Sequence, residues 1–328
     1  MEFILPEEIK EVPVEEDKYY DLIIIGAGPA GMTAGVYAGR KKLDTLVISK
    51  NVGGQTLLAP CVETYMGYQY ITGAELIRKF EEQVRQFPIA FSIGEEVTKL
   101  SVKDKFFAVL AYNGKKFKCK AVIIASGRRA RSLNMPREKE LTARGVSYCA
   151  TCDAPLFGGM DVAVIGSGNP AITAVNDLTK YARKIYNIVW VSVKADPILV
   201  EKVKKSGKVE FFSNYAVNEI RGADKVESIV IRDIKGDKEV VLNVEGVFIE
   251  IGSIANVEFA KDVVKLNELK EIEVDCGCKT SVAGIFAAGD VTNAPEKTNY
   301  RGSRRRRRSK SSSKCISLFN RILKKEKI

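Results

Sequence analysis

Two glycine-rich turns, each between a buried strand and a helix, constrain the fold of this chain more than any other feature. Asp21-Leu22-Ile23-Ile24-Ile25 runs into Gly26-Ala27-Gly28-Pro29-Ala30-Gly31, and Asp161-Val162-Ala163-Val164-Ile165 runs into Gly166-Ser167-Gly168-Asn169-Pro170-Ala171. Glycines at this spacing let the backbone approach a pyrophosphate at the N-terminus of the following helix. Either turn alone could be an ordinary tight connection, but its repetition predicts two nucleotide-binding folds.

The hydrophobic pattern around the turns predicts an α/β chain. After the first turn we expect a helix over 32–40 and a strand over 43–48. After the second turn we expect a helix over 172–181 and a strand over 185–191. Further segments are predicted as an amphipathic helix at 75–86 and as strands at 106–110, 117–119, 121–125, 247–251 and 284–288. The fold class is therefore α/β with two Rossmann-like nucleotide-binding domains.

A pair of thiols, in Cys149-Ala150-Thr151-Cys152-Asp153, lies just before the second turn. Such a pair can close into a disulfide and reopen, moving two electrons per cycle. A buried structural pair, half of a zinc site and chance are the alternatives. Zinc would need a second ligand pair, and Cys276-Gly277-Cys278 has a poor spacing for one, so we expect no metal. The chain has no histidine, so proton transfer must use another side chain, a cofactor or water.

Composition matters mainly through the distribution of charge. The 328 residues suffice for two domain cores. The net charge is +11, but residues 298–328 hold 12 of the 52 Lys and Arg and one of the 41 acids, so 1–297 carries 40 of each. We expect nucleic acid to bind only incidentally, through the Arg304–Arg308 run. The acidic arm 1–18 is unlike a signal peptide, no apolar run reaches ~20 residues, and seven cysteines suit a cytoplasmic protein.

The chain resembles the low-molecular-weight thioredoxin reductases, FAD-containing members of the pyridine nucleotide–disulfide oxidoreductases. The resemblance covers about residues 19–297. It rests on six motifs in order, namely Gly26-Ala27-Gly28-Pro29-Ala30-Gly31, Gly53-Gly54-Gln55, Val62-Glu63-Thr64-Tyr65-Met66-Gly67, Ala125-Ser126-Gly127, Ser147-Tyr148-Cys149-Ala150-Thr151-Cys152-Asp153 and Gly284-Ile285-Phe286-Ala287-Ala288-Gly289-Asp290.

The resemblance implies a discontinuous FAD domain, 1–128 and 254–328, interrupted by a central pyridine-nucleotide-type domain, 129–253, that carries the dithiol. It implies a homodimer and a thioredoxin-like or glutaredoxin-like partner. Cys152 would face the flavin, Cys149 would attack the partner's disulfide, and Asp153 would be the acid–base. Thr64 stands where the family usually has Asn. The residues expected to contact FAD are Gly26, Gly28, Pro29, Ala30, Gly31, Ser49, Gly53, Gly54, Gln55, Thr64, Ser126, Gly127, Gly289 and Asp290.

The second nucleotide site departs from the family pattern. Members that use NADPH follow the second strand with arginines that clamp the 2′-phosphate, whereas Val189–Pro197 offers only Lys194 as a cation. Pro170 also removes one backbone N–H from the turn. A nicotinamide nucleotide would be contacted by Gly166, Gly168, Asn169 and Lys194. The donor is left open between NADPH, NADH, reduced deazaflavin and ferredoxin, as in archaeal or anaerobic variants with an altered NADPH site.

The tail after Lys297 departs further, because the family continues there with Gln, four residues and Ala-Gly-x-Gly. One permitted codon set for residues 298–307 is ACA AAT TAT CGT GGC AGC AGG AGA AGG CGC. Dropping its first base gives Gln-Ile-Ile-Val-Ala-Ala-Gly-Glu-Gly, the missing motif. We therefore hypothesise that 298–328 is a frameshifted tail, which predicts weakened FAD retention; the DNA sequence would decide.

These observations together predict a flavoprotein disulfide reductase. Electrons would pass from a soluble reductant through FAD and the Cys149/Cys152 dithiol to a thioredoxin-like protein disulfide. The alternative is a non-catalytic flavoprotein or redox regulator that keeps the fold and has lost its NADPH site. No role is predicted for Cys276 or Cys278.

Overall fold

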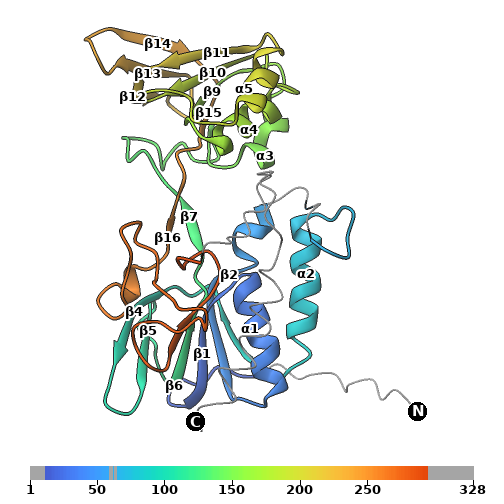
Figure 1. Cartoon of the computed structure of the whole chain (residues 1–328), viewed down its shortest axis with the longest axis vertical. Coiled ribbons are helices and arrows are strands. Elements are labelled where there is room, and N and C mark those ends of the chain that lie inside the picture. The colour runs from blue at the N-terminus through green and yellow to red at the C-terminus, as the bar shows by residue number, and fades with distance from the viewer. Residues whose placement is uncertain (1–11, 59–61, 63–64, 295–328) are drawn as a thin grey trace. The chain divides into compact units, whose positions relative to one another are not determined.

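The computed structural model of the chain describes residues 12–58, 62 and 65–294. They divide into two compact units: residues up to 129 and from 254 form the first unit, and residues 130–253 form the second (Figure 1). The first unit is therefore discontinuous in the sequence. The predicted α/β class with two Rossmann-like units is confirmed.

A seven-stranded mixed sheet forms the centre of the first unit. Its strand order is β3-β2-β1-β6-β5-β4, and β17 also pairs with β6. The strands β3, β2, β1, β6 and β17 are parallel, whereas β4 and β5 are antiparallel additions. The strand bounds are β1 (Tyr19–Ala27), β2 (Thr45–Val52), β3 (Ala90–Ile93), β4 (Val97–Val102), β5 (Phe107–Ala111), β6 (Lys116–Ile124) and β17 (Ile285–Ala287).

Successive side chains of a strand point to opposite faces, so the continuous apolar run Leu22–Ile25 of β1 fits a sheet that is covered on both faces. Leu22 and Ile24 pack into the core shared with α1 (Pro29–Arg40) and α2 (Gly73–Val84). Both helices lie on that face (Figure 1). Ile23 and Ile25 pack into the opposite core, with side chains of β4, β5 and the segment after 254.

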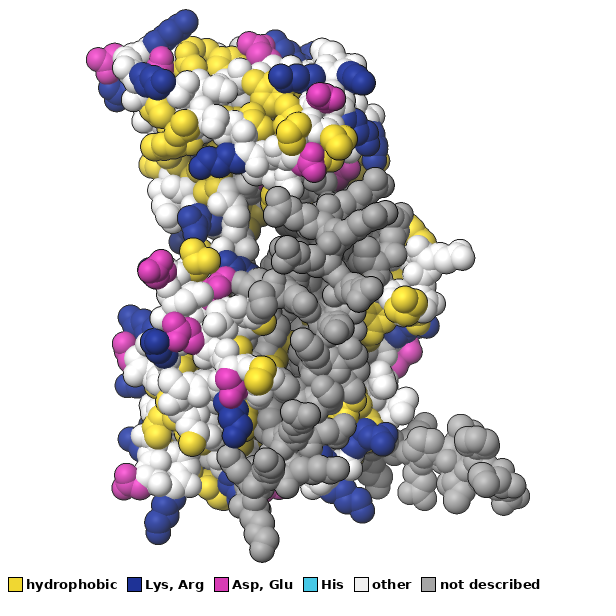
Figure 2. All heavy atoms as spheres, viewed as in Figure 1, with side chains coloured by type: hydrophobic (Ala, Val, Ile, Leu, Met, Phe, Trp, Pro, Cys, Tyr) yellow, Lys and Arg dark blue, Asp and Glu magenta, His cyan; other side chains and the backbone are white. Residues whose placement is uncertain are grey.

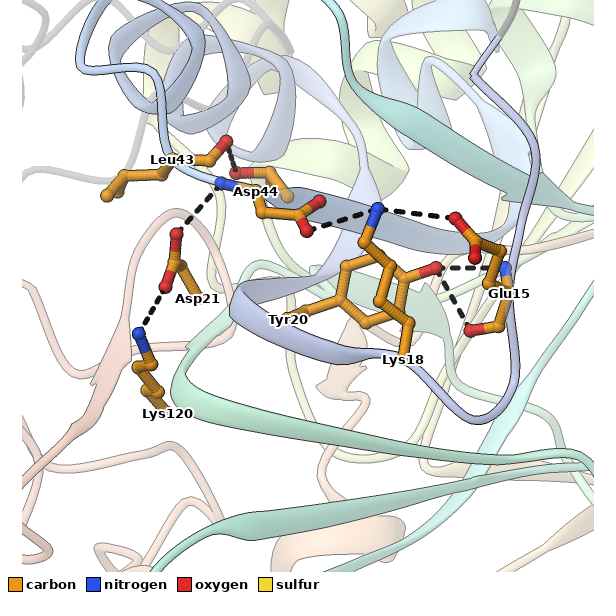
Figure 3. A network of polar contacts seen from close by, with 8 residues as sticks. Glu15, Lys18, Tyr20, Asp21, Leu43, Asp44 and Lys120 are labelled. Carbon is orange, nitrogen blue, oxygen red and sulfur yellow. Dashed lines mark hydrogen bonds and ion pairs between the residues drawn. The ribbon is translucent and has the colours of Figure 1, made fainter.

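A polar network joins three neighbouring strands, near the start of β1, just before β2 and in the middle of β6 (Figure 3). Asp21 accepts a hydrogen bond from Lys120 Nζ at 2.6 Å and another from the Asp44 N–H at 3.1 Å. Lys18 Nζ pairs with Asp44 at 3.1 Å. Burial opposes ionisation of Asp21, but the hydrogen bonds from Lys120 and Asp44 outweigh it and lower the pKa of the carboxyl. The network therefore fixes β1, β2 and β6 relative to one another.

The second unit has three layers. Its central sheet is parallel, in the order β11-β10-β9-β15-β8. One face packs against the helices, and the other packs against an antiparallel sheet, β12-β13-β14. The bounds are β8 (Val146–Ser147), β9 (Asp161–Ile165), β10 (Lys184–Val189), β11 (Val209–Ser213), β12 (Tyr215–Arg221), β13 (Ser228–Asp233), β14 (Glu239–Asn243), β15 (Gly246–Ile249), α3 (Ala150–Asp153), α4 (Asn169–Leu178) and α5 (Pro197–Lys204).

Several predicted boundaries are wrong. The strands expected at 117–119 and 121–125 are one continuous strand, β6. Its pattern changes along its length because the lysines of its first half stay exposed while its last residues are fully buried. Strand β2 continues to Val52, and α4 begins at Asn169 rather than 172 and ends at Leu178 rather than 181. The antiparallel sheet over 215–243 was not predicted.

The charge pattern of the visible face fits the balanced composition of residues 1–297. Figure 2 shows acidic and basic side chains intermixed over the described residues. Thr64, the Arg304–Arg308 run and the whole tail 298–328 lie outside the described residues, so the interpretations made of them stay predictions. Within the described ranges, no helix combines the length and apolar character needed to cross a membrane.

Candidate functional site

The dithiol lies at the end of β8, in the second unit. Cys149 is the N-cap of the single-turn helix α3, and its carbonyl accepts the N–H groups of Cys152 at 3.2 Å and Asp153 at 3.1 Å. This turn brings the two cysteines together as a disulfide, with 5.4 Å between their Cα atoms. Both cysteines and Asp153 are partly exposed. The disulfide therefore closes within a single, partly exposed turn.

Ser147 is a residue of this site whose role the sequence did not predict. Its hydroxyl donates to Asp153 Oδ2 at 2.6 Å and accepts the Cys149 N–H at 3.0 Å. Ser147 is 5% exposed, whereas its partners Asp153 and Cys149 are partly exposed. Ser147 begins the motif Ser147–Asp153, on which the family resemblance partly rests. Its position two residues before Cys149 was the signal in the sequence that could have indicated its role.

The first glycine turn has two crowded positions and one open position. A Cβ added at Gly26, whose φ is +108°, would overlap the carbonyl oxygen of Ala125. A Cβ at Gly31 would overlap the carbonyl oxygen of Gly26. By contrast, a Cβ at Gly28 would meet no described atom within 4 Å. The outer glycines therefore close the turn on itself, and the space at Gly28, at the start of α1, is open.

The loop after β2 closes over the same turn. Ser49 Oγ accepts the Ala27 N–H at 3.0 Å and donates to the Asn51 carbonyl at 2.7 Å. The Gly53 N–H donates to the Ala27 carbonyl at 2.7 Å. Gly54 has a φ of +55°, and a Cβ added to it would stand 3.8 Å from the Gly28 Cα. The structure thus brings Ser49, Gly53 and Gly54 to the turn, while Gln55 is exposed beside them.

The carboxyl end of β17 reaches the start of α1. A Cβ at Gly289 would stand 3.0 Å from the Ala30 Cβ, and Asp290 follows at once. The Asp290 carbonyl accepts a 3.5 Å hydrogen bond from Arg128, which also pairs with buried Glu271 at 2.7 Å. Gly289 therefore lies against Ala30 at the start of α1, although the two residues are far apart in the sequence.

Ser126 and Gly127 follow β6, next to Gly26. The Ser126 hydroxyl donates to the Asn256 carbonyl at 2.7 Å, and the Asn256 side chain donates back to the Ser126 carbonyl at 2.9 Å. The Gly127 carbonyl accepts the Asn256 N–H at 3.0 Å. In this structure the two residues hold the segment after 254, and their predicted FAD contact stays a prediction.

The geometry of the first turn fits the pyrophosphate of a dinucleotide. The space at Gly28 is one that a Cβ would fill, and no described side chain caps α1 or places an acid in its first turn. Pro29 at the first helical position costs no helix hydrogen bond. The partial positive charge of the helix N-terminus therefore remains available to an anion.

The second glycine turn is bound to the loop after β10. Gly166, with φ of +147°, lies against the carbonyl oxygen of Glu250, so this turn also needs glycine there. The Lys194 N–H donates to the Ser167 carbonyl at 2.7 Å, and the Asp196 N–H donates to Asn169 Oδ1 at 2.7 Å. The loop residues Lys194 and Asp196 are thereby held at the mouth of the turn formed by Gly166, Gly168 and Asn169.

A buried amide lies beneath this second turn and was not predicted. Asn187 is fully buried in β10, and its Nδ2 donates to the carbonyls of Val164 at 3.0 Å and Gly166 at 3.1 Å. Its Oδ1 has no hydrogen-bond partner among the described residues. A single Asn in an apolar strand pattern was the only signal in the sequence.

The other described cysteines differ from the dithiol. Cys119 is fully buried in β6, and burial raises the pKa of its thiol to about 12. Cys119 is therefore unreactive near neutral pH, because the thiolate is the nucleophile. Cys276 is exposed in the loop before β17.

Comparisons with known proteins agree on one class of relatives. The sequence profile of the family described as pyridine nucleotide-disulphide oxidoreductase matches residues 20–305. One alkyl hydroperoxide reductase subunit, that of Staphylococcus aureus, is 36% identical over 284 residues, 86% of this chain and 56% of that protein. The chain thus spans about half the length of these curated relatives.

Two solved structures are similar along almost their whole length. The thioredoxin reductase of Lactococcus lactis has a TM-score of 0.77 at 30% identity, covering 93% of this chain and 99% of its own. The thioredoxin reductase of T. acidophilum has a TM-score of 0.75 at 32% identity, covering 94% of this chain and 100% of its own.

Proposed function

The chain belongs to the pyridine nucleotide-disulphide oxidoreductase family, and from this membership we propose that it is a flavoprotein disulfide reductase acting on a thioredoxin-like protein disulfide. Electrons would come from a soluble reductant and pass through FAD to the Cys149–Cys152 pair. One observation carries the proposal: the pair forms a disulfide in a partly exposed turn and is followed directly by Asp153.

FAD, which the family generally binds, supplies two-electron reduction of a disulfide when it is bound. Its pyrophosphate would rest in the space at Gly28, between Gly26 and Gly31, with Pro29 and Ala30 opening the helix. Ser49, Gly53, Gly54, Gln55, Thr64, Ser126, Gly127, Gly289 and Asp290 are proposed to complete the site. The close approach of Gly54 and Gly289 to the helix start supports this set.

The reaction at the dithiol conserves electrons and protons. Two electrons and two protons convert the Cys149–Cys152 disulfide into two thiols. Cys149, as thiolate, attacks a sulfur of the partner disulfide and forms a mixed disulfide, releasing the partner's first thiolate. Cys152 then attacks Cys149, which releases the second thiol of the partner and restores the Cys149–Cys152 disulfide. Asp153 is proposed to accept and return the protons, because a thiol must lose its proton before it attacks.

Three further assignments rest on the family membership. The solved relatives are named thioredoxin reductases, so we propose a thioredoxin-like or glutaredoxin-like partner and a homodimer. We propose action in the cytoplasm, where a dithiol can cycle against a reducing pool. The domain containing residues 12–129 and 254–294 is proposed to bind FAD, and the one containing 130–253 the nicotinamide nucleotide.

The test of this function is anaerobic. NADPH, NADH and reduced deazaflavin are added in turn until one bleaches the flavin absorbance, and oxidised thioredoxin is then added. We expect the oxidised flavin spectrum to return as thioredoxin is reduced. A flavin that stays reduced after thioredoxin is added would support the non-catalytic alternative instead.

Of the two nicotinamide nucleotides, we expect NADH to half-reduce the flavin at a concentration at least about tenfold lower than NADPH requires, about 1.4 kcal/mol of binding. The loop whose backbone is held at the second turn contains Lys194 and Asp196, and residues 190–197 contain no arginine. A 2′-phosphate therefore lacks a bidentate partner and meets a like charge. Stopped-flow absorbance of the flavin measures both concentrations.

The matched variant is Asp196→Asn. Asp196 caps α5 by accepting the Ile198 N–H at 3.1 Å, and Asn keeps such a cap while removing the charge. We expect the variant to narrow the difference between NADH and NADPH without changing thermal stability. Equal use of NADH and NADPH by the unsubstituted protein contradicts the prediction. Reduction of the flavin by deazaflavin alone would show that the electron donor is not a nicotinamide nucleotide.

A further inference from the structure

Ser147 uses its hydroxyl twice within the dithiol turn. As donor it reaches Asp153 Oδ2 at 2.6 Å, and as acceptor it receives the Cys149 N–H at 3.0 Å. The first distance lies in the range of charge-assisted O–H···O⁻ bonds. One buried side chain thus joins the carboxylate that follows Cys152 to the backbone of Cys149.

The position of Ser147 is itself set by the sheet. It is the last residue of β8, where it pairs with Phe248 of β15, and Phe248 is fully buried. Asp153, by contrast, ends a single turn of helix and is partly exposed. Without a partner, an Asp side chain in that position can adopt several rotamers. The serine therefore selects the orientation of the carboxylate.

A hydroxyl is suited to this task because it can serve both protonation states of Asp153. Serine carries one donor hydrogen and two acceptor lone pairs. The Cys149 N–H occupies one lone pair, and the hydrogen goes to the ionised carboxylate. When Asp153 is protonated, its O–H can donate a hydrogen bond to the second lone pair of the Ser147 hydroxyl. The contact between the two side chains therefore persists in both protonation states.

We propose that Ser147 is a positioning residue of the disulfide reduction, one that holds Asp153 in place for proton exchange with the Cys149–Cys152 pair. The inference rests on the proposed function. In the step concerned, the Cys149–Cys152 disulfide takes up two electrons, which bound FAD would supply, and two protons, and becomes two thiols. Before attack on the partner disulfide, the Cys149 thiol gives its proton to Asp153. Ser147 contributes no electrons and no net proton.

The test is a double-mutant cycle in the FAD-containing full chain, with oxidised thioredoxin as acceptor. We expect Asp153→Asn to lower kcat about a hundredfold, the range for loss of a proton-transfer group. Ser147→Ala should lower kcat about tenfold and leave KM for thioredoxin unchanged, because the partner's contacts remain. Ser147→Ala placed in the Asp153→Asn background should cost nothing more, since the serine acts through the carboxylate.

Two further variants separate positioning from folding. Ser147→Thr keeps the hydroxyl and should recover most of the lost kcat. Ser206→Ala removes a serine that also donates at 2.6 Å, to the Val203 carbonyl, and accepts the Lys208 N–H at 3.3 Å, far from the dithiol in the sequence; it should leave kcat unchanged. Unchanged kcat in Ser147→Ala, or additive losses in the double variant, would overturn the inference. Unchanged kcat in Asp153→Asn would instead remove Asp153 from the proposed reaction.

Discussion

Replacing Cys149 by Ser is expected to lower thioredoxin reduction by at least about a thousandfold while the flavin is still reduced by its donor. The reason is that neither a disulfide with Cys152 nor a mixed disulfide with the partner can form on an oxygen. The measurement pairs a thioredoxin-reduction assay with anaerobic flavin absorbance. Loss of the first with retention of the second places the block after the flavin.

Cys152→Ser separates the two sulfurs. Cys149 can still attack the partner disulfide, but no thiol at position 152 remains to resolve the mixed disulfide. We therefore expect a covalent complex with one thioredoxin per chain, which mass spectrometry detects and dithiothreitol releases. Cys149→Ser should form none. The opposite result would exchange the proposed roles of the two cysteines. Cys276→Ser is the control, because Cys276 is exposed yet lies outside the dithiol turn; it should leave turnover unchanged.

A second large effect is expected from a pair of glycine-to-alanine substitutions in the first turn. Gly28 has φ of −78°, which alanine adopts readily, and its added Cβ meets no described atom within 4 Å. We therefore expect Gly28→Ala to fold normally and to weaken FAD binding at least about tenfold, about 1.4 kcal/mol, because the methyl group fills the proposed pyrophosphate space. Gly31→Ala should instead destabilise the protein by about 3 kcal/mol, since its Cβ overlaps the Gly26 carbonyl.

Two measurements distinguish these outcomes without an activity assay. Bound FAD per chain is read from absorbance against the unsubstituted protein, so any weakening caused by the tail cancels. The melting temperature is then followed with and without added FAD, because a ligand that binds only the native state raises it. A Gly28→Ala protein that keeps FAD at the unsubstituted level would place the pyrophosphate elsewhere.

The features predicted well from the sequence are those that local patterns determine. A buried strand that ends in glycines can be recognised because only glycine fits the crowded backbone at Gly26 and Gly31. The two βαβ units follow from that pattern. Boundaries were less predictable where long-range packing decides them, as in β6, whose exposed and buried halves were predicted as two strands.

Contacts that depend on the tertiary structure are harder to predict from the sequence. Ser147 and Asp153 are six residues apart, but their hydrogen bond depends on how α3 turns after β8. Gly289 reaches Ala30 only because β17 lies beside β6 in the sheet. The antiparallel layer of 215–243 has short strands whose apolar side chains are buried by another sheet, a pattern that single-sequence reasoning did not separate from loops.

The buried amide of Asn187 has an electrostatic consequence for the second turn. By donating to the Gly166 carbonyl, it draws the negative end of that peptide dipole toward the protein interior. The same hydrogen bond fixes the peptide plane between Gly166 and Ser167, so the backbone of the turn is held in one orientation from beneath. The Oδ1 of the same amide has no hydrogen-bond partner among the described residues. The second unit thus holds the backbone of its glycine turn by a hydrogen bond made from its own buried core.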